Sequence, residues 1–410
     1  MRVIGLDVHR NFAQVAILDG GLVKDHGRFV MEREAVLAFA NKVLTPEDDV
    51  VLEATGNTAI IVRLLTPFVR RVVIANPLQV RAIAWAKVKT DKIDAATLAR
   101  LHAAQFLPEV WMPPEDVELR RRVIAERTQL VGQMTRLKNR IQSILHANLL
   151  TKETGHIFSK RGRARLEALP LPADQMRMAL RHHDELARLA AELAIIDRDL
   201  AQHALADPNV KRLMTIGGVD AIVAASVLAA IGDIRRFPSP EKLVSYLGLN
   251  PSVHQSGDHP AYHGHITHQG RGHARGMLVE AAWSIASSPG PLSAFFHRIS
   301  VKRCKSVAAI ATARKLAVLI WHMLTKQQDY VWMRPALLQF KMRRLELMAG
   351  HASRRGGNKP GPARDYSVKA IRDQERARLA GAEQDYRRFV AGWRDRSPAK
   401  GIPVLKEGNA

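Results

Sequence analysis

Short apolar runs alternate with amphipathic stretches from residue 2 to about residue 110, a pattern typical of a domain that mixes strands and helices. The runs with strand patterning are bounded by turn residues such as Gly20 and Gly21. The predicted strands are 3–6, 12–18, 22–30, 50–52 and 72–74. The predicted helices are 32–43, 58–69 and one that begins near Asp91. The chain therefore opens with three strands joined by short loops and continues with alternating helices and strands.

The order of these elements is that of a ribonuclease-H-like fold. An antiparallel meander of three strands is followed by helix, strand, helix, strand and helix. We therefore predict an α/β domain of this class over residues 1–112. In such a sheet the ends of the first and fourth strands are neighbours, and a late helix packs beside them.

Two long helices with heptad spacing are predicted after this domain. Apolar residues at intervals of three and four residues form two seams. The seams are Leu130, Met134, Leu137, Ile141 and Ile144, and then Leu186, Leu189, Leu193, Ile196 and Leu200. The spacing fits an antiparallel hairpin within one chain and an intermolecular coiled coil equally well. Residues 113–206 are therefore predicted to be a coiled-coil linker, with the pairing of its helices left open.

The remainder of the chain divides into a helical region and a basic tail. Residues 207–330 are predicted to be mostly helical, with an apolar helix at 221–231 and an irregular insert, rich in His and Gly, at 250–275. The tail covers 331–410, and from residue 341 onward it holds 17 Lys and Arg against 8 Asp and Glu. We expect a solvated, partly flexible extension, helical near 369–393, that adds affinity for nucleic acid.

The charge balance narrows the class of partner. The 410 residues carry 62 Lys and Arg against 39 Asp and Glu, a formal net charge of +23, which favours a polyanion such as nucleic acid. A hydrophobic content of 47% excludes a wholly disordered chain.

The single cysteine, Cys304, excludes a disulfide framework and fits a reducing compartment. The apolar run 307–324 is interrupted by Arg314 and Lys315, so we expect no membrane partner. Together with the single cysteine, this favours a cytoplasmic protein.

Four acidic residues stand at positions that such a sheet and its neighbouring helix bring close together. Asp7 follows the first buried strand and Glu53 the fourth, while Asp91 and Asp94 share one face of a helix's first turn. Two Mg²⁺ ions, roughly 3.5 to 4 Å apart, take carboxylate ligands and stabilise the attacking and leaving oxygens of a phosphodiester. Each acid alone also fits a structural role: Asp91 as a helix N-cap, Asp94 as a first-turn acid and Glu53 as a surface residue. Their combination favours a metal site.

A helix-hairpin-helix pattern over residues 211–231 is a second candidate site. The hairpin contains Gly217 and Gly218, and backbone amides in such hairpins bind DNA phosphates without reading the sequence. Asp220 stands where the pattern usually has another glycine, and we expect it to cap the following helix. A purely structural turn remains the alternative.

The His- and Gly-rich insert holds a third candidate. Ser256 precedes Gly257 in a loop, where an exposed hydroxyl is accessible to a phosphate. Arg271, Arg275 and nearby histidines are candidates for neutralising developing charge. Most Ser-Gly pairs are turns, so this pair alone carries little weight. The six histidines from His254 to His273 lack the acids or cysteines of a zinc site, which favours phosphate contacts or plain loop positions.

Several motifs taken together closely resemble those of DEDD-type insertion-sequence transposases. That family includes RNA-guided recombinases and the related Piv-type DNA invertases. The motifs are Gly5-Leu6-Asp7-Val8-His9, Glu53-Ala54-Thr55-Gly56, Lys89-Thr90-Asp91-Lys92-Ile93-Asp94-Ala95, Ile231-Gly232-Asp233-Ile234, Tyr246-Leu247-Gly248-Leu249, Ser256-Gly257 and Gly264-His265-Ile266-Thr267. The resemblance runs from about residue 1 to residue 324. It departs from the family pattern at His268, Arg271 and Asp220, where Lys, Asn and Gly are expected.

The resemblance implies a site made of two parts. Residues 1–112 resemble a RuvC-like domain whose metal ligands match Asp7, Glu53, Asp91 and Asp94; the implied cofactor is a pair of Mg²⁺ ions, with Mn²⁺ as an alternative. Residues 207–330 resemble a transposase domain with a nucleophilic serine, which matches Ser256, and Ser252 is the second choice. The implied reaction cuts and rejoins strands through a covalent phosphoserine during excision and integration of the element.

The resemblance also implies partners. They are the DNA of the element ends and target, a guide non-coding RNA from the element, and further copies of the chain in a dimer or tetramer. The acids of one subunit and the serine of another are implied to complete one site. When bound to DNA, the protein is expected at the bacterial nucleoid. The candidate nucleic-acid contacts are Gly218, Arg271, Arg275, Lys89 and Lys92.

Three other functions stay open on the sequence. They are a site-specific invertase of the Piv type, a metal-dependent Holliday-junction nuclease that uses water instead of a serine, and a non-catalytic nucleic-acid scaffold. The acid pattern disfavours the scaffold, and the matched serine region disfavours the nuclease. The DNA that flanks the gene distinguishes a transposase from an invertase, whereas the target sequence and the use of a guide RNA do not follow from the protein sequence.

Overall fold

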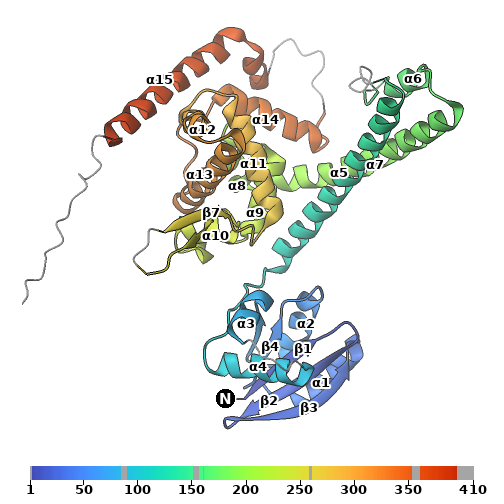
Figure 1. Cartoon of the computed structure of the whole chain (residues 1–410), viewed down its shortest axis with the longest axis vertical. Helices are drawn as coiled ribbons and strands as arrows, with labels where there is room; N and C mark the ends of the chain where they lie inside the picture. The colour runs from blue at the N-terminus through green and yellow to red at the C-terminus, as the bar shows by residue number, and fades with distance from the viewer. Residues whose placement is uncertain are drawn as a thin grey trace, which may run out of the picture. The chain divides into compact units, whose positions relative to one another are not determined.

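A computed structural model describes residues 2–84, 90–150, 157–159, 161–257, 261–352 and 361–394. Its contacts divide the chain into two compact units, Met1–Pro114 and Glu115–Ala410, and each is described by itself (Figure 1). The division falls close to the predicted boundary at 112, whereas the predicted boundaries at 206 and 330 lie inside the second unit. The separation of a linker, a transposase domain and a tail therefore stays a prediction.

The first unit is built on a five-stranded mixed sheet with the order β3-β2-β1-β4-β5. The strands are β1 (Val3–Val8), β2 (Phe12–Asp19), β3 (Leu22–Val30), β4 (Asp49–Glu53) and β5 (Arg71–Ala75). β2 is antiparallel to β1 and β3, while β4 is parallel to β1 and β5. This sheet is consistent with the predicted ribonuclease-H-like fold, and β1 and β4 are neighbours in it.

Helices cover both faces of this sheet. They are α1 (Arg33–Val43), α2 (Thr58–Leu65), the short 3-10 helix η1 (Thr66–Phe68), α3 (Pro77–Ile83) and α4 (Asp91–Ala103). Successive strand residues point to opposite faces. Leu6 and Leu52 therefore belong to the core shared with α1 and α2, whereas Val51 belongs to the core shared with α3 and α4. Helix α3 was not predicted from the sequence, although Asn76 caps it and Pro77 begins it.

A long helical hairpin opens the second unit. α5 (Glu115–Ala147) and α7 (Ala173–Ala206) pack along each other, with α6 (Gly162–Glu167) near the turn (Figure 1). Ile124 clusters with Leu200, and Ile141 clusters with Ala179, which fits antiparallel helices. Of the two pairings that the heptad spacing allowed, the structure contains the hairpin; a coiled coil between chains stays a prediction.

Short helices and one long apolar helix form the main core of the second unit. The elements are α8 (Pro208–Met214), α9 (Ala221–Ile231), the 3-10 helix η3 (Ile234–Arg236), α10 (Pro240–Tyr246), α11 (Gly272–Ala286), α12 (Pro291–Lys302) and α13 (Lys305–Lys326). α9 has the predicted bounds. Among the described residues, α13 alone is long and apolar enough to cross a membrane, and half of its most apolar window is buried inside the unit. It packs against α10, α11 and α12 as a core helix does.

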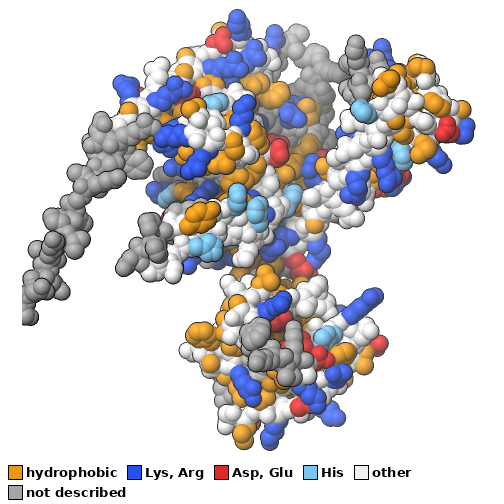
Figure 2. Space-filling model, in the orientation of Figure 1, with side chains coloured by type: hydrophobic (Ala, Val, Ile, Leu, Met, Phe, Trp, Pro, Cys, Tyr) orange, Lys and Arg blue, Asp and Glu red, His pale blue; other side chains and the backbone are white. Residues whose placement is uncertain are grey.

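The insert at 250–275 is not wholly irregular, so that expectation was wrong. β6 (Pro251–His254) and β7 (Tyr262–Ile266) pair antiparallel, and α11 begins at Gly272. The short strands carry His and Gly in place of alternating apolar residues, so the period-two pattern that marks a half-buried strand is missing. Figure 2 shows histidines near this hairpin, and Lys and Arg side chains scattered over the visible face of both units.

The expectation of a solvated C-terminal extension was wrong for its first helix. α14 (Pro335–Met348) places Leu345 in the core, and Ala349 follows it there. The 3-10 helix η4 (Pro362–Ser367) comes next, and α15 (Lys369–Arg394) is the helix expected near 369–393. α15 itself buries Leu379 and Ala382. The apolar residues of α14 alternate with basic ones, so the sequence pattern predicts that the segment is part of the solvated basic tail. One face of the helix nevertheless packs against the core.

Candidate active site

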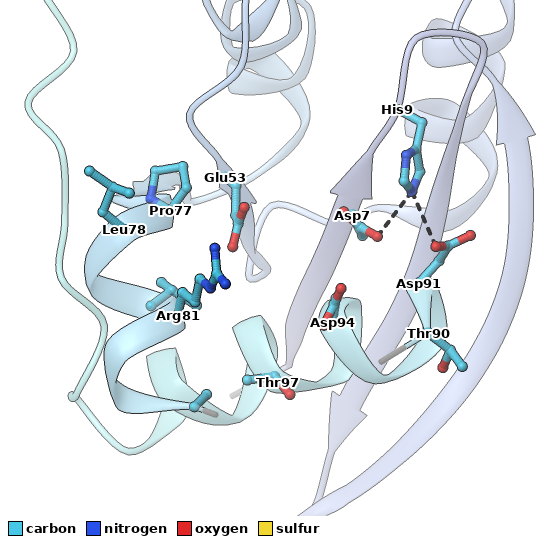
Figure 3. Close-up of a pocket in the computed structure, with 12 residues that line it drawn as sticks. Asp7, His9, Glu53, Pro77, Leu78, Arg81, Thr90, Asp91, Asp94 and Thr97 are labelled. Atoms are coloured by element: carbon cyan, nitrogen blue, oxygen red, sulfur yellow. Dashed lines mark hydrogen bonds and ion pairs between the residues drawn. The ribbon is translucent and has the colours of Figure 1, made fainter. Parts of the chain in front are cut away.

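Two of the predicted acids come from the neighbouring strands β1 and β4. Leu6 of β1 lies opposite Leu52 of β4, so the next residue of each strand, Asp7 and Glu53, falls at the same edge of the sheet. Both side chains line one cavity of about 740 Å³ (Figure 3). The two acids therefore lie where strand order and parallel pairing predict.

The other two acids come from the first turn of α4. The cap of this helix is Thr90, whose hydroxyl accepts a hydrogen bond from Ile93 N at 3.4 Å, so Asp91 is not the N-cap that the structural alternative required. Asp91 and Asp94 line the same cavity as Asp7 and Glu53 (Figure 3). The structure therefore brings all four predicted acids together.

Gly5 explains how close α4 comes to the sheet. A Cβ atom on Gly5 would overlap the carbonyl oxygen of Ala95 and lie 3.2 Å from Ala99 N. Only a residue without a side chain permits this approach. Because Asp94 directly precedes Ala95, the same contact fixes its position beside Asp7.

His9 joins the site and was not assigned a role from the sequence. Its Nε2 lies 3.1 Å from Asp7 Oδ2 and 3.4 Å from Asp91 Oδ1, so one imidazole bridges the strand and the helix (Figure 3). The signal was present in the sequence, since His9 lies two residues after Asp7. Only the position of α4 shows that it also reaches Asp91.

Asp91 is held from its other side by a chain of polar side chains on β2 and β3. Arg28 Nη2 lies 3.0 Å from Asp91 Oδ2, and Arg28 Nε donates to Gln14 Oε1 at 2.8 Å. Gln14 Nε2 in turn donates to Asp25 Oδ1 at 2.5 Å, and Lys92 Nζ lies 2.5 Å from Asp25 Oδ2. Lys92, predicted as a nucleic-acid contact, therefore forms an ion pair with Asp25, and Lys89 lies outside the described residues.

The electrostatics of Asp7 reflect a concentration of negative charge. Burial raises the pKa of Asp7 above its ordinary value, the charges of Asp94 and Asp91 raise it further, and His9 opposes the shift. Oxygen donors that repel one another in this way suit a bound divalent cation. Asp7, His9 and Asp91 each offer one ligand atom, and these three atoms all lie within 4.8 Å of one another. This spacing fits a single ion.

The second unit carries the predicted serine. Ser256 is exposed just after β6, whereas Ser252 lies within β6, with its Oγ 2.5 Å from the point where a Cβ on Gly264 would stand. Of the two, Ser256 is the more accessible to a large substrate.

The predicted basic contacts of the second unit have structural partners. Arg271 Nε donates to Tyr246 Oη at 2.8 Å. Arg275 Nη1 donates to the carbonyl oxygens of Leu247, at 3.1 Å, and His268, at 3.3 Å. Arg275 therefore joins two loops, and its contact with nucleic acid stays a prediction.

The hairpin between α8 and α9 is present as a turn between two helices. Asp220 caps α9 as expected, because its Oδ1 accepts from Val223 N at 2.8 Å. Gly218 packs against α11: a Cβ there would lie 2.5 Å from Ala281 O and 2.7 Å from Ile285 Cγ1. Packing alone thus requires this glycine, and its contact with DNA stays a prediction.

Comparison with known proteins decides the family. A model described as "Transposase IS116/IS110/IS902 family" matches residues 210–297, and a second, described as a transposase and of the DEDD type, matches residues 4–148. The two segments together include the four acids and the serine. The chain belongs to this family of transposases.

Individual similar proteins agree with this assignment. The transposase is 28% identical to a probable family 20 transposase of Pseudomonas aeruginosa over 80% of its own length and 98% of the relative's. It is 27% identical to the transposase of insertion element IS1111A of Coxiella burnetii, over 59% and 68% of the two chains. A pilin gene-inverting protein of Moraxella bovis is 28% identical over 63% and 74%.

Family membership fixes the general activity. The transposase is an enzyme that binds, cuts and rejoins DNA. The DEDD-type domain implies the use of a divalent metal, and the oxygen-rich cavity of Asp7, Glu53, Asp91 and Asp94 fits one.

Proposed function

We propose that this transposase excises and integrates its own insertion sequence with a DEDD metal site and a serine nucleophile. The observation that carries the proposal is the convergence of Asp7, Glu53, Asp91 and Asp94 on one cavity. Like charges gathered from two strands and a helix raise the pKa of Asp7 and bring no evident benefit to the fold. They do suit the binding of divalent cations.

The residues of this cavity would hold Mg²⁺, with Mn²⁺ as an alternative. A bound pair of such ions supplies charge stabilisation at the attacking and leaving oxygens of a phosphodiester. The chain itself holds the donors in place. Arg28 and His9 fix Asp91 from two directions, and the close packing at Gly5 fixes α4.

Ser256 is proposed as the nucleophile. Its Oγ attacks the phosphorus of a DNA strand, the bond from phosphorus to the 3′ oxygen breaks, and the 3′ oxygen takes up the proton that the serine gives up. A 3′ hydroxyl of another strand then attacks the phosphoserine, the bond between phosphorus and Oγ breaks, and Oγ takes up the proton that the 3′ hydroxyl gives up. No water is consumed, so strands are exchanged without net hydrolysis. The exposure of Ser256 supports this role.

The proposed DNA contacts lie in both units. The α8–α9 hairpin, with Gly218, offers backbone amides to phosphates, and Arg271, Arg275 and Lys92 add positive charge. The net charge of +23 supports a large polyanionic partner. A guide RNA from the element, a dimer or tetramer, and a cytoplasmic location at the nucleoid are proposed on the family resemblance.

A second candidate function is site-specific inversion. The similarity to the pilin gene-inverting proteins of Moraxella bovis and Moraxella lacunata favours it. The chemistry at the two parts of the site is the same for both functions. The arrangement of the DNA sites, inverted on one molecule or carried by a mobile element, separates them.

The experiment that tests the proposal is a recombination assay in cells. The gene with its native flanking DNA and a target plasmid is expressed as wild type, Asp7→Asn, Ser256→Ala and Ser252→Ala, and new junctions are sequenced. We expect junctions from the wild type and from Ser252→Ala, because Ser252 is partly buried within β6 with its hydroxyl next to Gly264, and is less accessible to DNA than Ser256. Asp7→Asn and Ser256→Ala are expected to make none.

Two outcomes would contradict parts of the proposal. Normal recombination by Ser256→Ala, with loss in Ser252→Ala, would move the nucleophile to Ser252. Cleavage by both serine variants that still depends on Asp7 would indicate a metal-and-water nuclease. Expression and solubility of every variant are checked in the same cells.

A further inference from the structure

Helix α14 reaches back to the hairpin between α8 and α9. Lys341 Nζ donates to the carbonyl oxygens of Met214, Ile216 and Val219, at 2.9, 2.7 and 2.8 Å. An ammonium group has three N–H donors, and the three carbonyls use all of them. One cation is thus enclosed by one turn of the main chain.

Convergence of this kind is unfavourable without a cation. Each carbonyl oxygen carries partial negative charge, and three of them aimed at one point repel one another. Burial lowers the pKa of Lys341 to about 7, the negative charge of Asp220 opposes this shift, and the positive charge of Arg334 adds to it. The three carbonyl contacts stabilise the charged form against the cost of burial.

We propose that Lys341 is a built-in cation that fixes the α8–α9 hairpin in the shape that binds DNA phosphates, in the place that a monovalent ion would otherwise take. This is a positioning role, in which Lys341 acts through the hairpin. It rests on the proposed use of that hairpin in DNA binding. α14 lies beyond both segments matched by the family models, 4–148 and 210–297, so the family match does not assign this role.

The surroundings of the hairpin show why the cation matters there. Gly218 packs directly on α11 and anchors one part of the turn. The hydroxyl of Thr215 accepts a hydrogen bond from Tyr330 N at 3.0 Å, and Lys341 secures the carbonyls. Without Lys341, the carbonyls lose their common donor, and the turn is free to open on that side.

The test uses the full chain as wild type, Lys341→Ala, Lys341→Met and Arg344→Met. Affinity for duplex DNA and melting temperature are measured without divalent metal, at equal ionic strength, in potassium, ammonium or tetramethylammonium chloride. Arg344 is exposed on the same helix, so Arg344→Met controls for the loss of one positive charge.

The proposal predicts a cation-specific rescue. In tetramethylammonium, Lys341→Ala should bind DNA about tenfold more weakly than wild type, since several charge-assisted hydrogen bonds are lost. Potassium or ammonium should restore both affinity and melting temperature, because the shorter side chain leaves space for a small cation. Lys341→Met fills that space with an apolar chain and should stay weak in all three salts. Arg344→Met should show no difference between the salts.

Several results would overturn the proposal. Equal DNA affinity of wild type and Lys341→Ala would do so, as would a salt response no larger than that of Arg344→Met. Unfolding of Lys341→Ala in all three salts also contradicts it, whereas unfolding in tetramethylammonium alone supports it. A wild type that forms no junctions in cells refutes the proposed function, and the cation-dependent melting then still decides whether Lys341 acts as a built-in cation.

Discussion

Asp7 lies in surroundings that work against its own ionisation. It is partly buried in β1, and Asp91 and Asp94 approach it from α4. His9 compensates in part, since its Nε2 contacts both Asp7 and Asp91. An ionised carboxylate in such surroundings lowers the stability of the fold. Its replacement therefore tests the role of Asp7 in the reaction without destabilising the protein.

We predict that Asp7→Asn abolishes recombination without loss of stability. Junction formation should fall at least about a hundredfold, because a bound metal contributes several kcal/mol of transition-state stabilisation. The melting temperature without divalent metal should equal or exceed that of the wild type, since one of several like charges is gone. Glu34→Gln, at an exposed position on α1, serves as the control for loss of one acid. A marked drop in melting temperature for Asp7→Asn alone would instead assign Asp7 a structural role.

The same residue predicts a pH dependence of stability. The pKa of Asp7 is raised in the folded state, so between the unfolded and folded pKa values the folded chain binds more protons. The contribution of Asp7 to the free energy of unfolding therefore falls as pH rises through that window. Urea titrations without metal from about pH 4 to pH 7 should show a more negative slope for the wild type than for Asp7→Asn. Parallel slopes for the two proteins would rule out the raised pKa.

The positions of the four acids followed from the sequence, and their neighbours did not. Asp7 and Glu53 come directly after the apolar runs of their strands, and the spacing of Asp91 and Asp94 places them on one helix face, so local periodicity sufficed. Arg28 reaches Asp91 only because β3 pairs with β2 in one particular register. Register between strands is set by the whole sheet, so this contact could not be read from local spacing.

At the scale of elements, β1 and α4 make the closest approach found at any described glycine of the first unit. The backbone of α4 lies against Gly5 with no space for a side chain. A substitution at this position changes the distance between a strand and a helix that both carry metal-site acids.

We predict that Gly5→Ala destabilises the transposase by about 3 kcal/mol, because its Cβ would overlap Ala95 O and force α4 away from the sheet. Recombination should fall even at temperatures where the variant is folded, since Asp91 and Asp94 move with α4. Gly56→Ala is the matched control: a Cβ at Gly56 meets no atom within 4 Å, so its effect should stay within about 0.5 kcal/mol. Thermal denaturation of both variants checks the prediction, and equal melting temperatures would contradict it.

Strands β6 and β7 and helix α14 were not predicted, because none of them shows a clear hydrophobic period in the sequence. β6 and β7 bury few apolar residues, so no hydrophobic period marked them. α14 was concealed by its basic residues, although Leu338, Met342 and Leu345 share one face. By contrast, β3 and α9 were predicted with their observed bounds, because turn residues or a dense apolar run delimit them.

At the scale of the whole molecule, the acids and the serine belong to different units. The family resemblance implies that one site draws its acids and its serine from different subunits. Such an arrangement has a measurable consequence, because two defective chains can each supply the part that the other lacks.

We predict that Asp7→Asn and Ser256→Ala complement each other when they are co-expressed. In a dimer formed at random from equal amounts, half of the molecules are mixed and one of their two sites is intact, so about a quarter of the wild-type activity should return. Junction sequencing checks this, with each variant expressed alone as the control. If the mixture is as inactive as either variant alone, the acids and serine of one site come from the same chain.

The contact between Lys341 and the hairpin carbonyls also limits how much of the 3′ end of the gene can be lost. A stop codon soon after residue 330 would spare every candidate catalytic residue and both segments that identify the family. Its product would nevertheless lose Leu345 and Ala349 from the core, and the ammonium group that binds three carbonyl oxygens of the α8–α9 hairpin. Degraded copies of such an element can therefore look complete by their catalytic residues and still encode an unstable protein. The shortest working gene is set by packing at its 3′ end, which also limits how far the protein can be trimmed for use as a recombination tool.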